Sequence, residues 1–349
     1  MDRELNRFRT LGASPKELAE ADFIVASSDL KRWDEFSPDE GANQEARRRA
    51  QRVMSDFYDK EKSRDVSAQY VVQAAYWVAK MKAASGAYDV NDWWKNTIGA
   101  FARFKRSAPA KDGKNTALGS REAGMGAEAE FRLIDQDLTK KFDYETGFHR
   151  YHGTPTDVVG AYRKDATVAK AWFDKLQSVV DNYLSAEWTT VAMARQGSLY
   201  DSLRTGLYNT RPPALQMYTK KQEAALKQAE QSDVPELQER ADAMRTSIQQ
   251  AWRDARDKEL DSADTILIDR YAASIVLARR YNVSNPAITR AIRRLAYITD
   301  VIGEAKMQTH ASKVPDLNYQ PGTFQKMRPG LVTTPKPAGM PRPLPVLAQ

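Results

Sequence analysis

The stretch Asp261–Lys306 reads DSADTILIDRYAASIVLARRYNVSNPAITRAIRRLAYITDVIGEAK, and its two apolar patterns decide the fold class. Apolar residues recur at helical spacing on both sides of the short segment NVSNP, which predicts two helices joined by a break. Ser284 is the expected N-cap of the second helix, and Pro286 falls in its first turn, where a missing N–H is tolerated. We expect the first helix to run from about Thr265 to Tyr281.

The same stretch fits a helix-turn-helix pattern, with Asn282 where such a turn needs a left-handed residue. Residues 276–298 are therefore a candidate DNA-reading unit, in which the second helix enters a groove. An ordinary antiparallel helical hairpin with a basic solvated face also explains the pattern, and a first helix of about four turns favours this simpler interpretation. The side chains that would reach DNA are Thr289, Arg290, Arg293 and Arg294.

Helical periodicity recurs through most of the chain, whereas alternating strand patterns are rare. We therefore predict an all-α fold, a bundle of helical hairpins with long antiparallel helices. The expected division is an N-terminal helical domain at 1–110, a flexible Gly-rich linker at 111–129, a helical bundle at 130–305 and an extended arm at 306–349. The side chains expected in the core are Trp77, Trp172, Leu176, Trp188, Ile248, Ile288 and Leu295.

The most regular part of the bundle is a heptad-like hairpin at 214–260, followed by the helix–break–helix at 261–306. Its small seam residues permit close helix approach, either within the chain or between copies. The seam residues, at alternating steps of four and three, are Leu237, Ala241, Met244, Ile248, Ala251 and Ala255.

The segment 306–349 differs from the rest in holding eight of the 16 prolines and a net charge of +5, from six basic residues and one acidic residue. The whole chain has a net charge of +7, so the rest is nearly balanced. A Pro-rich segment without a helical stripe is typical of an arm that orders on another surface. The residues expected to make that contact are Lys313, Leu317, Tyr319, Phe324, Lys326, Arg328, Arg342 and Leu344.

Composition and motifs limit the chemistry. The 349 residues include no cysteine, which excludes disulfides, thiolate metal sites and cysteine nucleophiles. His149 and His152 lie near two acidic residues, but a turn would not fix their geometry, so we predict no metal site. No nucleophile with a base and no phosphate loop has convincing spacing, so we predict neither catalytic residues nor a cofactor.

These features favour a non-enzymatic structural or assembly protein, and the class that they fit best is an oligomeric phage virion component. It would be an internal core, DNA-ejection or tail-associated protein, bound to its own copies or other virion proteins. The expected location is the virion, reached from the host cytoplasm. The alternative is a cytoplasmic helix-turn-helix regulator or replication protein. No apolar run is long enough to span a membrane, and contact with DNA or a membrane surface is left open.

Overall fold

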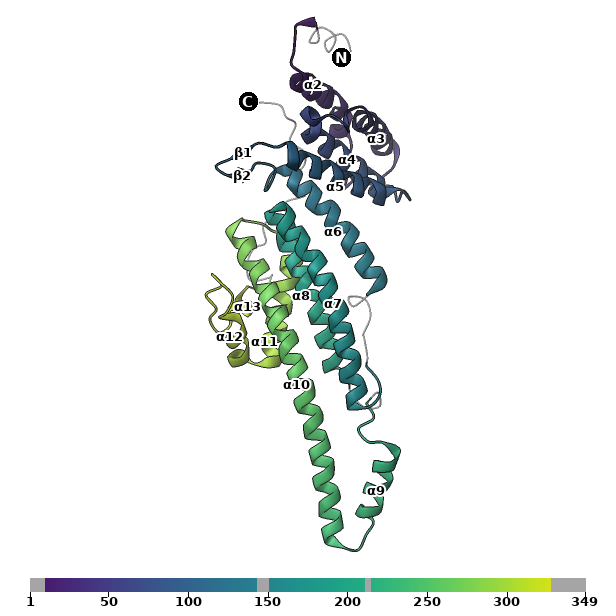
Figure 1. The fold of residues 1–349 in the computed structure, drawn as a ribbon, viewed down its shortest axis with the longest axis vertical. Coiled ribbons are helices and arrows are strands. Elements are labelled where there is room, and N and C mark those ends of the chain that lie inside the picture. Colours follow the sequence, from purple (N-terminus) through teal and green to yellow (C-terminus); the bar gives the residue numbers. More distant parts are fainter. Residues whose placement is uncertain (1–9, 143–150, 211–214, 328–349) are drawn as a thin grey trace. The chain divides into compact units, whose positions relative to one another are not determined.

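A computed structural model describes residues 10–142, 151–210 and 215–327 (Figure 1). Regular structure in these ranges is helical apart from a short antiparallel pair, β1 (Ala110–Lys111) and β2 (Lys114–Asn115). The predicted all-α fold with long helices is confirmed. The described residues belong to two compact units, which we treat separately.

The first unit contains the described residues up to Gln136 together with Ser178–Thr189. Its central helix is α4, in which Ala68 and every residue from Tyr70 to Met81 are buried. A helix buried around its whole circumference needs neighbours on several sides, and α2, α3 and α5 all contact it. The elements of this unit are α2 (Pro15–Ser27), η1 (Asp29–Arg32), α3 (Gly41–Glu61), η2 (Asp65–Ser67), α4 (Ala68–Ala84), α5 (Val90–Ser107), β1, β2 and most of α6 (Arg121–Lys141).

The predicted Gly-rich linker at 111–129 is wrong from Arg121 onward, where α6 begins. Gly126 of α6 packs against Phe101 and Tyr183, and a Cβ at this glycine would lie 2.6 Å from Cε1 of Tyr183. Glycine is required here because the helices approach closely, and its backbone freedom is not used. The sequence pattern could not reveal this, because Tyr183 is far away along the chain.

The second unit contains the described residues of Asp137–Gln177 and of Thr190–Pro335. Trp172, Leu176, Ile288 and Leu295 are buried here, as predicted, whereas Ile248 is half-buried. In the first unit Trp77 is buried and Trp188 is half-buried. The elements of the second unit are most of α7 (Pro155–Tyr183), most of α8 (Ala186–Tyr208), α9 (Lys220–Glu230), α10 (Pro235–Arg280), α11 (Pro286–Ile302), α12 (Glu304–Ala311) and α13 (Thr323–Lys326).

The helix α10 continues without a break for 46 residues (Figure 1). The sequence interpretation divided this segment between a hairpin ending at residue 260 and a helix beginning near Thr265, and that boundary is wrong. Between Glu236 and Tyr281 the sequence contains neither proline nor glycine, so nothing ends the helix. The predicted hairpin exists as α9 paired with the N-terminal part of α10.

The turn between α10 and α11 largely follows the local sequence signals. Asn282 takes a positive φ of 51°, the left-handed conformation expected there. Pro286 is the first residue of α11, as predicted, but the N-cap is Asn285 and not Ser284. The Asn285 Oδ1 accepts a hydrogen bond from the backbone N–H of Ile288 at 3.0 Å.

The prediction of an extended arm from residue 306 is wrong for the described part of that segment. The segment contains most of α12 and all of α13, and Leu317, Tyr319 and Phe324 are buried within the chain. The hydroxyl of Tyr319 donates a hydrogen bond to Glu304, which also accepts from the backbone N–H of Gly322 at 3.0 Å. The apolar anchors therefore serve the chain's own core. Lys313 and Lys326 are exposed, and Arg328, Arg342 and Leu344 lie outside the described residues.

Candidate functional site

The four residues predicted to contact DNA lie on α11, but they do not share one environment. Arg294 donates two hydrogen bonds to Asp201 of α8, with Nε and Nη2 at 2.6 and 2.7 Å from the carboxylate oxygens. This pairing raises the pKa of Arg294 above its ordinary value. Thr289 is half-buried, while Arg290 and Arg293 are exposed. Arg294 is thus engaged within the fold, and the two other arginines remain at the surface.

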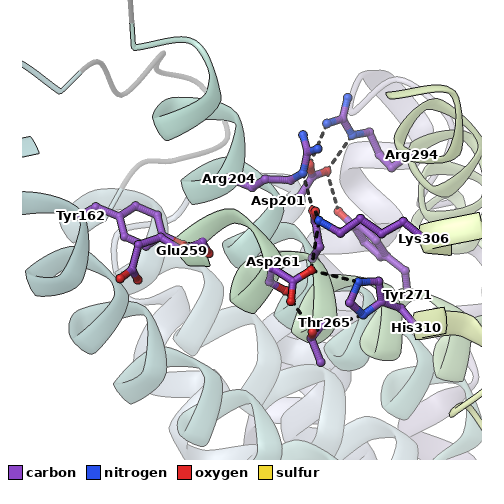
Figure 2. A network of polar contacts seen from close by, with 11 residues as sticks. Tyr162, Asp201, Arg204, Glu259, Asp261, Thr265, Tyr271, Arg294, Lys306 and His310 are labelled. Carbon is purple, nitrogen blue, oxygen red and sulfur yellow. Dashed lines mark hydrogen bonds and ion pairs between the residues drawn. The ribbon is translucent and has the colours of Figure 1, made fainter. Parts of the chain in front are cut away.

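Arg294 and Asp201 belong to a network of charged side chains in the second unit (Figure 2). The Asp201 carboxylate also accepts a hydrogen bond from the hydroxyl of Tyr271 at 3.3 Å. Arg204 of α8 donates its Nε–H to Asp264 of α10, and both side chains are buried. The network therefore begins with two arginine–aspartate pairs that join α8 to α10 and α11.

The helix α12 supplies the other side of this network (Figure 2). Lys306 places Nζ 3.0 Å from Asp261 and 3.6 Å from Asp264, and its hydrogen bond lowers the pKa of Asp261. His310 lies with Nδ1 3.3 Å from Oγ1 of Thr265 and Nε2 3.5 Å from Asp261. Burial lowers the pKa of His310, which favours its neutral form.

The network is balanced in charge, which favours a structural role for it. A buried ion is stable only when it is partnered, and here each cation faces a carboxylate. The groups are Arg204, Arg294 and Lys306 on one side and Asp201, Asp261 and Asp264 on the other. Sequence reasoning missed this network, although Asp264 within an otherwise apolar helical stripe was a usable signal. The stripe residues are Leu260, Ala263, Leu267 and Ile268.

The first unit has a comparable cluster between α4 and α6. Lys80 is buried with Nζ 2.5 Å from Glu35 and 3.5 Å from Glu128. The Glu128 carboxylate also accepts hydrogen bonds from the Tyr76 hydroxyl and from Nε of Arg132, both at 2.7 Å. Here too, each buried charge has a partner, as structural ion pairs require.

A different kind of feature lies on the N-terminal half of α10. The helix α9 covers one side of it, where Ala241 is buried and Arg245 pairs with Glu230 at 2.5 Å. The adjacent side is uncovered, and its Leu237 and Met244 are 42% and 43% exposed. We call this side the outer face. Its seven exposed residues, at alternating steps of three and four, are Leu237, Arg240, Met244, Ser247, Ala251, Asp254 and Lys258.

The outer face includes three residues of the predicted heptad seam, Leu237, Met244 and Ala251. The seam was expected to pack within the chain or between copies. The helix α9 covers the side of Ala241 and leaves Leu237, Met244 and Ala251 exposed. Large apolar side chains exposed in one row commonly mark an interaction site. The uncovered row is the candidate functional site of this chain.

Metal sites and membrane-spanning helices can be assessed in the part of the chain that the structure describes. No group of three histidine or acidic side chains there could hold a metal ion. His149, which the sequence analysis considered as a metal ligand, lies outside that part. None of the described helices contains an apolar stretch of the length that a membrane span requires.

The fold and the site together define an all-α protein in which the long helix α10 has an uncovered outer face. No protein-family model matches the chain, and no curated protein or solved structure matches it either.

Proposed function

We propose that this chain is a non-enzymatic structural protein that works within an assembly of its own copies and other proteins. The observation that supports this most is the outer face of α10, which leaves Leu237 and Met244 exposed on a helix extending beyond its own core contacts. Exposed apolar residues that recur every seven positions, here Leu237, Met244 and Ala251, are typical of a helix that pairs with another helix. Within the chain, α9 covers only the adjacent side of α10, where Ala241 lies.

The setting that we propose is a phage virion, with the chain as an internal core, DNA-ejection or tail-associated protein. The support is compositional: a cysteine-free helical body and a basic, Pro-rich segment beyond residue 327. Segments of that composition are suited to binding neighbouring surfaces. We propose that residues 328–349 make such a contact and that their arginines pair with acidic groups.

Sedimentation velocity of the purified chain, over a wide range of protein concentration, tests the assembly role. We expect species heavier than the 39.4 kDa chain, increasing with concentration. A mass of one chain at every concentration, together with absence from purified particles of the encoding phage, would contradict the proposal. The particle measurement is quantitative mass spectrometry of virions purified free of lysate.

A second candidate function is DNA binding through residues 276–298. The left-handed turn at Asn282 and the exposed Arg290 and Arg293 favour it, whereas the engagement of Arg294 with Asp201 does not. Phosphate-binding arginines should weaken duplex binding when removed, and base-reading ones should relax sequence preference. We expect the double variant Arg290→Ala/Arg293→Ala to bind duplex DNA at low salt as the wild type does. Clear loss of affinity in the double variant would establish the DNA-binding role instead.

A further inference from the structure

We infer that the outer face of α10 binds the same face of a second copy of this chain, with the two helices antiparallel and Ser247 at the twofold axis. This inference rests on the proposed assembly function and specifies where two copies meet. It follows from the order of side chains along the seven-residue row, from their charges and from their exposure.

Two of the three charged residues on the outer face, of opposite sign, lie at equal distances on either side of Ser247. Arg240 lies seven residues before it and Asp254 seven residues after it, each about 10.5 Å away along the helix axis. In an antiparallel pair centred on Ser247, Arg240 of each copy therefore faces Asp254 of the other. The contact is made twice, as a twofold symmetric interface requires.

A parallel pair in register would place like charges together. Arg240 would face Arg240 of the second copy, Asp254 would face Asp254, and Lys258 would face Lys258. Like charges in close contact destabilise a helix pair, so the charge pattern selects the antiparallel arrangement.

The apolar side chains complement one another in the same register. Met244 lies three residues before Ser247 and Ala251 four residues after it, so the long methionine of one copy meets the small alanine of the other. Leu237 similarly meets Lys258, whose aliphatic stem can cover it while the ammonium group stays in water. At these two levels of the row, a large apolar side chain thus faces a small or flexible one.

The charged groups and the helix surface are available for this contact. Asp254 accepts a hydrogen bond from neutral Gln250 at 2.7 Å, which leaves its charge uncompensated. In the described residues, Arg240 forms no ion pair. Ser262, further along α10, is also exposed, close to where the end of a second helix would lie.

Reciprocal charge reversal tests the pairing, with the dimer dissociation constant measured by sedimentation equilibrium. We expect Arg240→Glu and Asp254→Arg each to raise this constant at least about tenfold, because each creates two like-charge contacts. The double variant should return to within about threefold of the wild type, since the pairs are re-formed in reverse. Single variants that associate like the wild type, or a double variant no better than the singles, would overturn the inference. Circular dichroism of each variant checks that the helices are intact.

Because the chain has no cysteine, Ser247→Cys introduces a single thiol at the proposed axis. Mild oxidation should convert this variant into a disulfide-linked dimer. The matched control is Thr246→Cys, an exposed neighbour that points about 100° away around the helix, and it should cross-link far less. Equal or absent cross-linking of the two variants, while the wild type still self-associates, would refute the antiparallel pairing and leave the assembly function standing. A wild type that stays monomeric would refute the pairing of copies, and monomers that are also absent from purified particles would refute the assembly function as well.

Discussion

Arg204 of α8 donates its Nε–H to Asp264 of α10 in the second unit, and the two side chains are 4% and 1% exposed. Removing one member of a buried ion pair leaves the other charge without compensation, which costs about 3–5 kcal/mol. We therefore expect Asp264→Ala to lower the free energy of unfolding by about that amount. Urea denaturation followed by circular dichroism measures the change.

The control for this prediction is an exposed ion pair on α7. Lys170 places Nζ 3.0 Å from Asp174, and both side chains are more than half exposed. Solvent-exposed pairs contribute about 0–1 kcal/mol, so Asp174→Ala should have little effect. Comparable losses in the two variants would show that burial does not decide the energy of these pairs.

His310 should make the stability of the second unit depend on pH. Burial lowers its pKa below the ordinary value of 6.5, although the nearby Asp261 acts in the opposite direction. The unfolded chain therefore takes up the proton at a higher pH than the folded chain. Stability is fully present above the unfolded pKa of about 6.5 and falls as the pH is lowered through it towards the folded pKa.

The measurement is the free energy of unfolding of the wild type and His310→Gln between mildly alkaline and mildly acidic pH. The wild type should lose more stability on acidification than the variant, which cannot titrate at this position. Parallel pH profiles would mean that the histidine has the same pKa in both states.

Two apolar residues that were both predicted to lie in the core should differ in how much their replacement by alanine lowers the free energy of unfolding. Leu176 is completely buried, whereas Ile248 is half-buried beside the outer face. Leu176→Ala should lower the free energy of unfolding by about 2–5 kcal/mol, because it leaves a cavity. Ile248→Ala should cost less than about 1 kcal/mol, because solvent already reaches the site. The reverse order in urea denaturation would contradict the assignment of helical faces.

The short helix α13 gives a further prediction. Phe324 is completely buried, while Lys326, two residues further on, is exposed. Phe324→Ala should lower the free energy of unfolding by about 3–5 kcal/mol, and Lys326→Ala by less than about 0.5 kcal/mol. If Phe324→Ala left stability unchanged and impaired only assembly, the original interpretation of this residue as an intermolecular anchor would be restored.

Features that depend on neighbouring residues were predictable from the sequence. The capping box of α2 is one example: Ser14 accepts from the backbone N–H of Glu17, whose side chain accepts in return. The left-handed Asn282 and the first-turn Pro286 are others. In each case the interacting residues lie within a few positions of one another in the sequence.

Features that depend on distant residues were not predictable in this way. Gly126 resembled a linker residue until Phe101 and Tyr183 were found against it. Phe324 resembled an anchor for a partner because its burial depends on the packing of α13 against α11, which the sequence pattern did not reveal. The candidate site was predictable in part, since the heptad seam of α10 was visible in the sequence. Which part of the seam stays uncovered depends on where α9 packs.

The pairing of two copies through the outer face is tested by sedimentation equilibrium of the wild type, Met244→Glu and Thr246→Glu. Both substitutions add the same charge to an exposed residue of α10, but Met244 lies in the outer face and Thr246 points away from it. We predict self-association of the wild type and Thr246→Glu with similar constants, and at least about tenfold weaker association of Met244→Glu. Equal association of all three proteins would contradict the claim that copies of this chain meet at the outer face of α10.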